Sequence, residues 1–88
     1  MAEVQMNKAE YEHLQTMVLL IAKRHLREFT SDYMRILCIK NGLIKEDVTE
    51  DDFGGKVIVP LVKSQQLQLV RSIPAGQSSI PVWALSAP

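Results

Sequence analysis

The feature that most constrains the fold is a stripe of mainly apolar side chains at helical spacing near the start of the chain. The stripe recurs every three or four residues, at Tyr11, Leu14, Val18, Ile21, His25 and Phe29. This spacing predicts one long helix from about Lys8 to Phe29, with its apolar face turned to a core and His25 within that face. Asn7 is a competent N-cap, and Glu10 completes a capping box with it. Residues 1–6 have no period and are expected to be frayed.

The middle of this helix carries more apolar surface than one stripe. Met17, Leu19 and Leu20 lie off the main face, and an excess of this kind marks association surfaces. We therefore predict that these three residues form a dimer or partner surface. The alternative is a helix buried on several sides within one compact domain.

A second, shorter helix is predicted after the sequence Phe29-Thr30-Ser31-Asp32. Thr30 or Ser31 can cap it, with Phe29 as a hydrophobic staple. The helix is expected to run to about Lys40 and to end at Asn41-Gly42, because a glycine just past the last periodic residue suits a left-handed C-cap. Its expected buried side chains are Tyr33, Ile36, Leu37 and Cys38, with Leu43 and Ile44 packing back onto it.

The third element allows two interpretations. Thr49 is a candidate N-cap followed by acids that suit a helix N-terminus, which predicts a helix over residues 51–66 with a kink near Pro60, or one that begins near Val59. However, Gly54-Gly55 and Pro60 weaken a helix. The β-branched run Val57-Ile58-Val59 also suits a strand.

The last third of the sequence predicts a β-hairpin. Strand-like runs cover residues 67–73 and 80–85, and the Pro/Gly/Ser-rich stretch 74–79 lies between them as a polar tip. Pro81 indicates an edge strand. No repeat or linker divides the 88 residues, so one small domain is expected.

This order of elements resembles the winged helix-turn-helix domain, and three short segments are similar to small phage-type members. Phe29-Thr30-Ser31-Asp32-Tyr33 resembles the start of their second helix, Gly55 to Ser64 their third helix, and Ile80-Pro81-Val82-Trp83 their returning wing strand. The resemblance implies an α+β winged helix-turn-helix fold, with three helices followed by a two- or three-stranded antiparallel wing. It favours the helix over the strand for the third element. Pro60, the preceding acids and Ile80 depart from the family pattern.

A winged helix-turn-helix domain reads duplex DNA with an exposed helix face and its wing. On a helix over residues 51–66, one face would hold Lys56, Val59, Lys63 and Gln66, while Val57, Ile58, Leu61 and Val62 turn inward. In the wing, Arg71, Gln77, Ser78 and Ser79 are donors suited to phosphate or minor-groove contact. Lys40 is a further candidate for a backbone contact. The predicted function is a DNA-binding regulatory or mobile-element accessory protein that acts as a homodimer.

Charge argues in both directions. Ten basic and ten acidic residues give a net charge of zero, which disfavours DNA binding by bulk positive charge. The charge is uneven, however, because five acids and no base lie in residues 46–55, whereas residues 56–88 hold three bases and no acid. The alternative function is therefore a winged-helix module for protein contacts that does not bind DNA.

Other classes are disfavoured. One cysteine, Cys38, excludes a disulfide framework and a multi-cysteine zinc site. No nucleophile, base and electrophile can be assembled into an active site, so no enzyme, cofactor or metal site is expected. The longest apolar run is too short for a membrane span, and the polar start of the chain does not resemble a signal peptide. A cytoplasmic location without membrane contact is expected.

Overall fold

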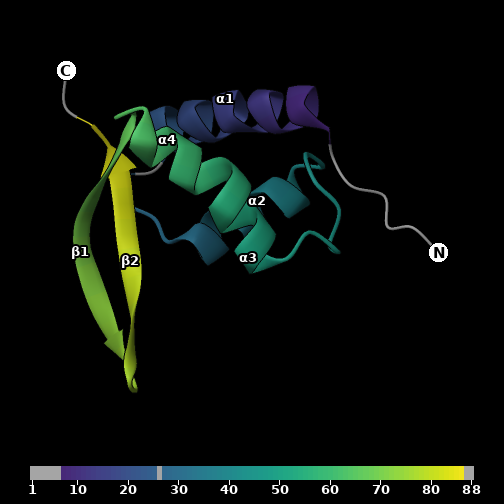
Figure 1. Ribbon diagram of the computed structural model, residues 1–88. Helices are drawn as coiled ribbons and strands as arrows, with labels where there is room; N and C mark the ends of the chain where they lie inside the picture. Colours follow the sequence, from purple (N-terminus) through teal and green to yellow (C-terminus); the bar gives the residue numbers. More distant parts are fainter. Residues whose placement is uncertain (1–6, 26, 87–88) are drawn as a thin grey trace.

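The computed structural model describes residues 7–25 and 27–86 and has an α+β fold (Figure 1). Helix α1 (Lys8–His25) and helix α2 (Ser31–Lys40) precede a third helical segment, residues 50–63. That segment consists of α3 (Glu50–Phe53), the π-helical η1 (Gly54–Ile58) and α4 (Val59–Lys63). Strands β1 (Leu67–Ala75) and β2 (Ser78–Leu85) form an antiparallel hairpin that projects from the helical body. The layout is compatible with a winged helix. The predicted fraying of residues 1–6 lies outside the described residues.

Helix α1 begins as predicted and ends earlier than predicted. Asn7 and Glu10 form a reciprocal capping box, in which each side chain accepts the other's backbone N–H at 3.0 and 2.9 Å. The helix stops at His25, which is exposed rather than in the core. Phe29 is extended and exchanges two backbone hydrogen bonds with Trp83, at 2.9 and 2.8 Å. Its side chain is buried although its backbone is extended. Helical spacing of an apolar residue therefore does not by itself show that the residue is in the helix.

Helix α2 has the predicted limits and a different buried face. The Thr30 hydroxyl accepts the Tyr33 N–H at 3.2 Å, and Gly42 follows the helix with a φ of 72°. The buried side chains are Met34 and Cys38, whereas Tyr33 and Ile36 are exposed. The prediction for Tyr33 and Ile36 was wrong because several faces of α2 are apolar, and only packing against the rest of the body selects one of them.

The third segment is helical, so the strand interpretation of residues 56–59 was wrong. The Thr49 hydroxyl caps it by accepting the Asp52 N–H at 3.1 Å. Pro60 has no N–H, and in an α-helix the carbonyl of residue 56 would therefore lack its donor. Here the chain widens to a π-helix, with the Val59 N–H donating to the Gly54 carbonyl, and Gln15 of α1 donates to the Lys56 carbonyl at 3.0 Å. The proline is thus accommodated by local rewinding and one tertiary hydrogen bond.

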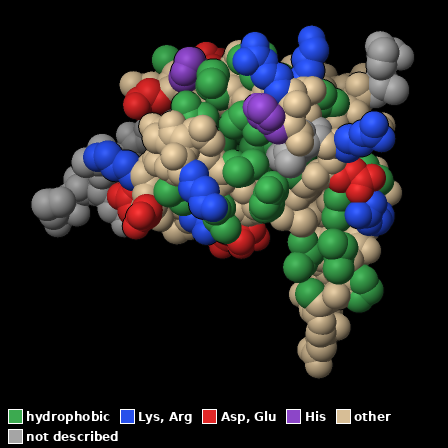
Figure 2. Space-filling view, turned by 180° about the vertical axis from the view of Figure 1, so that it is seen from behind, with side chains coloured by type: hydrophobic (Ala, Val, Ile, Leu, Met, Phe, Trp, Pro, Cys, Tyr) green, Lys and Arg blue, Asp and Glu red, His purple; other side chains and the backbone are tan. Residues whose placement is uncertain are grey.

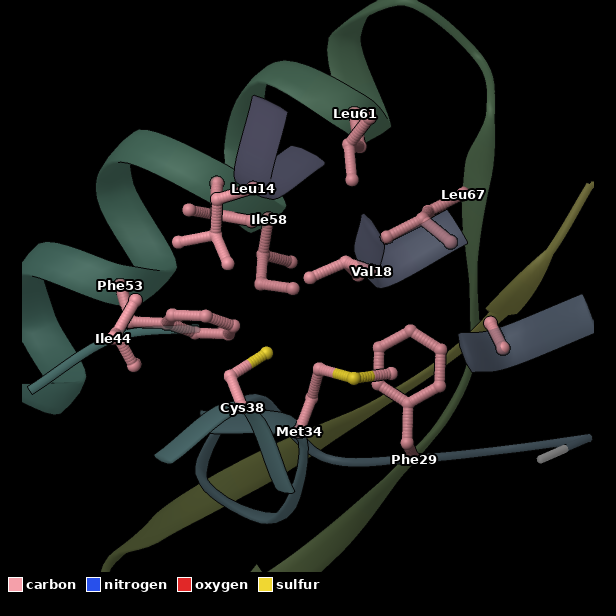
Figure 3. Packing of buried hydrophobic residues seen from close by; sticks show 12 residues of the cluster. Leu14, Val18, Phe29, Met34, Cys38, Ile44, Phe53, Ile58, Leu61 and Leu67 are labelled. Atoms are coloured by element: carbon pink, nitrogen blue, oxygen red, sulfur yellow. The ribbon is translucent and has the colours of Figure 1, made fainter. Parts of the chain in front are cut away.

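The core lies where α1, α2 and the third segment meet (Figure 3). Leu14 and Val18 of α1 face Phe53 and Ile58 of the third segment, and Met34 of α2 lies beside the Phe29 ring. Leu67 closes the side of the core next to the hairpin. Ile44 is buried and Leu43 packs against the cluster, as predicted.

The hairpin is more regular than its sequence suggested. Its register runs from Leu67↔Leu85 to Ala75↔Ser78, so both strands extend into the predicted tip and leave only Gly76 and Gln77 as the loop. Gly76 has a positive φ of 64°, whereas the φ of Gln77 is not positive. This combination suits a two-residue turn with glycine at its first central position. Val70 forms a β-bulge, because Leu69 pairs with Trp83 and Arg71 with the adjacent Val82, so that Val70 is an extra residue in β1.

Candidate nucleic-acid interface

The outer side of the third segment carries three of the four predicted recognition residues. Lys56, Val59 and Lys63 are exposed, while Val57, Ile58 and Leu61 are buried on the opposite side. Val62 is half-buried and packs against the core. The predicted burial of Val57, Ile58 and Leu61 and the predicted exposure of Lys56, Val59 and Lys63 are therefore confirmed.

Lys56 also contacts α1. Its ammonium lies 5.2 Å from the centre of the Tyr11 ring, within the range of a cation–π contact. Its backbone carbonyl is held by Gln15 of the same helix. The cation therefore sits at the groove between α1 and the third segment, and the contact restrains its side chain without removing its charge.

Gln66 does not lie on the helix, contrary to the prediction. The helix ends at Lys63, and Gln65 adopts a φ of 65° that turns the chain. The Gln66 amide donates to the Ser64 hydroxyl at 3.0 Å, and its backbone carbonyl accepts from the Ser86 N–H at 3.1 Å. Gln66 therefore belongs to the junction between the third segment and the hairpin. The sequence-based helix was too long because no glycine or proline marks this turn.

The wing candidates fall into two groups. Gln77, Ser78 and Ser79 are exposed at the tip, where the Ser78 hydroxyl donates to the Ala75 carbonyl at 3.1 Å. Arg71 lies nearer the body, and its guanidinium pairs with the Glu28 carboxylate. The tip thus offers polar groups without charge, and the one wing cation is already paired with an acid.

Acidic residues occupy the start of the third segment. Glu50, Asp51 and Asp52 are all exposed in the first turn of α3. In a helix-turn-helix, the N-terminal residues of the recognition helix approach the bases. Here these residues carry negative charge, so any approach of DNA is favoured at Lys56 to Lys63 and disfavoured at residues 50–52.

The remaining predicted residues are dispersed. Lys40 is exposed at the last position of α2, a different element from the third segment and the hairpin. On α1, Leu19 packs against the core and Met17 is half-buried, whereas Leu20 is exposed. Of the three residues predicted as an association surface, only Leu19 is therefore shown to pack within the chain.

The sequence analysis missed an exposed apolar side of the hairpin. Val70, Ile73 and Ile80 are exposed on the hairpin, and Tyr33 of α2 lies close to Ile73, across a shallow groove. Viewed from behind, green side chains gather on the hairpin between the body and its tip (Figure 2). The available signal was the composition of 67–73, in which apolar residues occupy both alternating positions although the sheet has only two strands.

Little else suggests a chemical site in the part of the chain that is described. Burial raises the pKa of the Cys38 thiol from 9.0 to about 11, which disfavours the reactive thiolate. Across residues 7–25 and 27–86, no three His, Cys, Asp or Glu side chains are grouped as metal ligands would be. Over the same residues, no helix combines the length and apolarity needed to cross a membrane.

The sequence matches no family model, and no match was found among curated proteins or solved structures.

Proposed function

We propose that this chain binds duplex DNA, with the outer side of its third segment facing the major groove and the hairpin tip on the flanking backbone. The observation that carries the proposal is the exposed set Lys56, Val59 and Lys63 on a helix that leads directly into a projecting hairpin. A helix beside a β-ribbon has the dimensions to enter a groove and to touch the adjacent backbone.

Each of these side chains has a chemical role in this arrangement. Lys63 at the end of the segment can bind a phosphate or the acceptors on a guanine edge. Val59 can contact a thymine methyl group. Lys56, held beside Tyr11, can donate to a phosphate with less loss of side-chain freedom than an unrestrained lysine. The hydroxyls of Ser78 and Ser79 and the Gln77 amide can donate to phosphates at the tip.

The charge distribution sets the expected strength of binding. One chain offers few cations on this side, and the acids of α3 repel phosphate at one end of it. A tight DNA-binding protein makes about 6–10 phosphate contacts. We therefore expect one chain to bind duplex DNA at roughly 10⁻⁴–10⁻⁶ M at physiological salt, the range of non-specific binding. Two chains on one duplex would bind more tightly.

The proposal is tested by anisotropy of a labelled duplex titrated with protein at several salt concentrations. Lys63→Glu should weaken binding about tenfold and lower the salt slope by roughly one. Lys56→Glu should act in the same direction. Lys45→Glu is the matched control, because it changes the net charge equally at an exposed position next to Glu46 and Asp47. Equal losses in Lys63→Glu and Lys45→Glu would contradict the assigned surface.

A protein-interaction module without DNA binding is the second candidate. It is favoured by the exposed apolar side of the hairpin and by the pairing of Arg71 with Glu28. This function predicts no duplex binding at moderate salt. It also predicts that polar substitution at an exposed apolar residue, rather than at Lys63, disrupts the interaction of the chain with its partner.

A further inference from the structure

The outer half of the hairpin receives little support from the body. All seven residues from Gln68 to Pro74 are exposed on β1, and the first three residues of β2 are exposed as well. A two-stranded hairpin without a covered face is marginally stable in water. The length and regular register of this hairpin therefore call for additional contacts on at least one side.

The register identifies the side that is most suited to such contacts. Residues directly opposite in an antiparallel pair share a face, and a bulge places two residues opposite one. Ile73↔Ile80 and the bulge at Val70 thus place three exposed apolar side chains on the face that also holds Val82. Tyr33 continues this face across the groove that Ile73 and Val82 line. We call Tyr33, Val70, Ile73 and Ile80 the hairpin patch.

The hairpin patch has the size of an interface core. Its four residues are each 41–50% exposed, and the largest apolar patch on a typical monomer covers roughly 300–600 Å². Glu28, Thr30 and Arg71 line the groove beside it and would form part of a polar rim. A standard interface buries about 800 Å² on each partner, so this patch with its rim suits a dimer of modest affinity.

The charges beside the patch suit a second copy of the same chain. Glu28 and Arg71 border the groove, and they are the charged side chains that line it. About a two-fold axis the same patch meets itself, so a contact from one chain to the other is made twice. The Arg71 of each chain can then pair with the Glu28 of the other, and two chains with zero net charge do not repel each other.

We propose that this chain forms a homodimer in which the hairpin patches of two copies pack face to face about a two-fold axis. Each hairpin then covers the other, as the two sheets of a sandwich do. Lys56, Val59 and Lys63 of the third segment are not part of the patch, whereas Ser78 at the tip lies on the same face as Ile73 and Ile80. Dimerisation is therefore tested separately from DNA binding by Lys56 and Lys63.

The experiment is sedimentation equilibrium of the full chain over a wide concentration range. The wild-type mass should rise from monomer to dimer with a Kd on the order of micromolar, as expected for a small interface. Ile80→Lys should weaken dimerisation at least tenfold. Leu20→Lys is the matched control, because Leu20 has the same 41% exposure on α1, and it should leave the dimer intact. Ile80→Thr keeps the β propensity of the strand and should weaken the dimer to a smaller extent.

A charge exchange tests the orientation of the two chains. Glu28→Arg leaves two bases at the rim of each patch and Arg71→Glu leaves two acids, so each variant alone should be monomeric. An equimolar mixture of the two should form a heterodimer. Circular dichroism of each variant confirms that the fold is retained.

Two results would overturn the proposal. One is a wild-type chain that stays monomeric at every concentration, which would leave a different protein as the partner of the patch. The other is a dimer that is lost in Leu20→Lys and kept in Ile80→Lys, which would place the interface on α1. Loss of DNA binding in Lys63→Glu with an unchanged dimer would separate the two surfaces.

Discussion

In the helical body, apolar side chains from three helical segments converge on one core, whereas in the hairpin they are spread over both sides of a two-stranded sheet. Phe53, Met34 and Val18 are fully buried in the body. On the hairpin, Leu69 is 55% exposed on one side, and Ile73 and Ile80 are exposed on the other. The comparison teaches that the buried apolar side chains that stabilise the fold lie mainly in the body, whereas the outer hairpin leaves its apolar side chains exposed to solvent.

The two regions meet at Trp83. The backbone N–H and carbonyl of Trp83 both form hydrogen bonds with the backbone of Phe29. Its indole N–H donates to the Ser31 hydroxyl at 3.3 Å. Val82 next to it is buried. The base of the hairpin is thus anchored to α2 and to the core, while the outer half extends beyond these contacts. We expect the boundary of cooperative unfolding to fall between these two halves.

The largest expected effect compares a core residue with a hairpin residue. Phe53→Ala should lower the free energy of unfolding by about 3–5 kcal/mol, because it leaves a cavity in the middle of the core. Leu69→Ala should change it by less than about 1 kcal/mol, since the side chain is mostly exposed. Urea unfolding, measured at concentrations where the chain is monomeric, checks both. Similar losses in the two variants would contradict the division between the regions.

The next expected effect depends on pH and concerns the buried thiol of Cys38. The unfolded chain releases the Cys38 proton near its ordinary pKa of 9.0, whereas burial raises the pKa in the folded chain to about 11. The stability associated with the neutral thiol is therefore fully present below pH 9 and is lost as the pH rises toward 11. The difference in unfolding free energy between wild type and Cys38→Ala should narrow over this interval. A constant difference would show that water reaches the thiol.

A smaller effect concerns the link between α1 and the third segment. Gln15→Ala should lower the free energy of unfolding by about 1 kcal/mol, because the Lys56 carbonyl loses its hydrogen-bond donor. Pro60→Ala supplies a backbone N–H at the position from which an α-helix would donate to that carbonyl. The loss caused by Gln15→Ala should therefore shrink by roughly 0.5–1 kcal/mol in the Pro60→Ala background, as a double-mutant cycle measures. Thr16→Ala, on the neighbouring position of α1, is the control and should show no such coupling.

The smallest expected effect on global stability is at the hairpin tip. Gly76 has a φ of 64°, which strains any residue with a side chain. If the outer hairpin opens independently of the body, Gly76→Ala should lower the free energy of global unfolding by less than about 0.5 kcal/mol. Hydrogen exchange of the amides in residues 72–80 should nevertheless become faster. A decrease of about 1 kcal/mol in the free energy of global unfolding would show that the hairpin and the body unfold together.

Local signals predicted most of the element limits. Asn7, Thr30 and Thr49 each accept a backbone N–H three residues on, as their positions before helical periods indicated. Gly42 ends α2 in the left-handed conformation that a glycine after a helix predicts. These features involve residues close in sequence, so the sequence contains the information that specifies them.

The misassigned residues involve partners distant in sequence. Phe29 became a bridge to Trp83 rather than the end of α1, and Tyr33 was exposed because α2 turned Met34 and Cys38 to the core. Among the candidate site residues, Lys56 and Lys63 are exposed on a helical segment as predicted. Gln66 is not on the helical segment, because the chain turns at Gln65. The hairpin patch was missed, since it joins Tyr33 to residues some forty positions later.

The sequence by itself determined two capped helices, a third element with Thr49 as its N-cap and a hairpin around Gly76, because caps and turns act over a few residues. Tertiary structure alone decided which face of α2 is buried, how Pro60 is accommodated and where apolar side chains stay exposed. The physical reason is that the burial of a side chain depends on which other groups pack against it. For Gln15 and the Lys56 carbonyl, or for Tyr33 and Ile73, the group opposite belongs to a distant part of the chain.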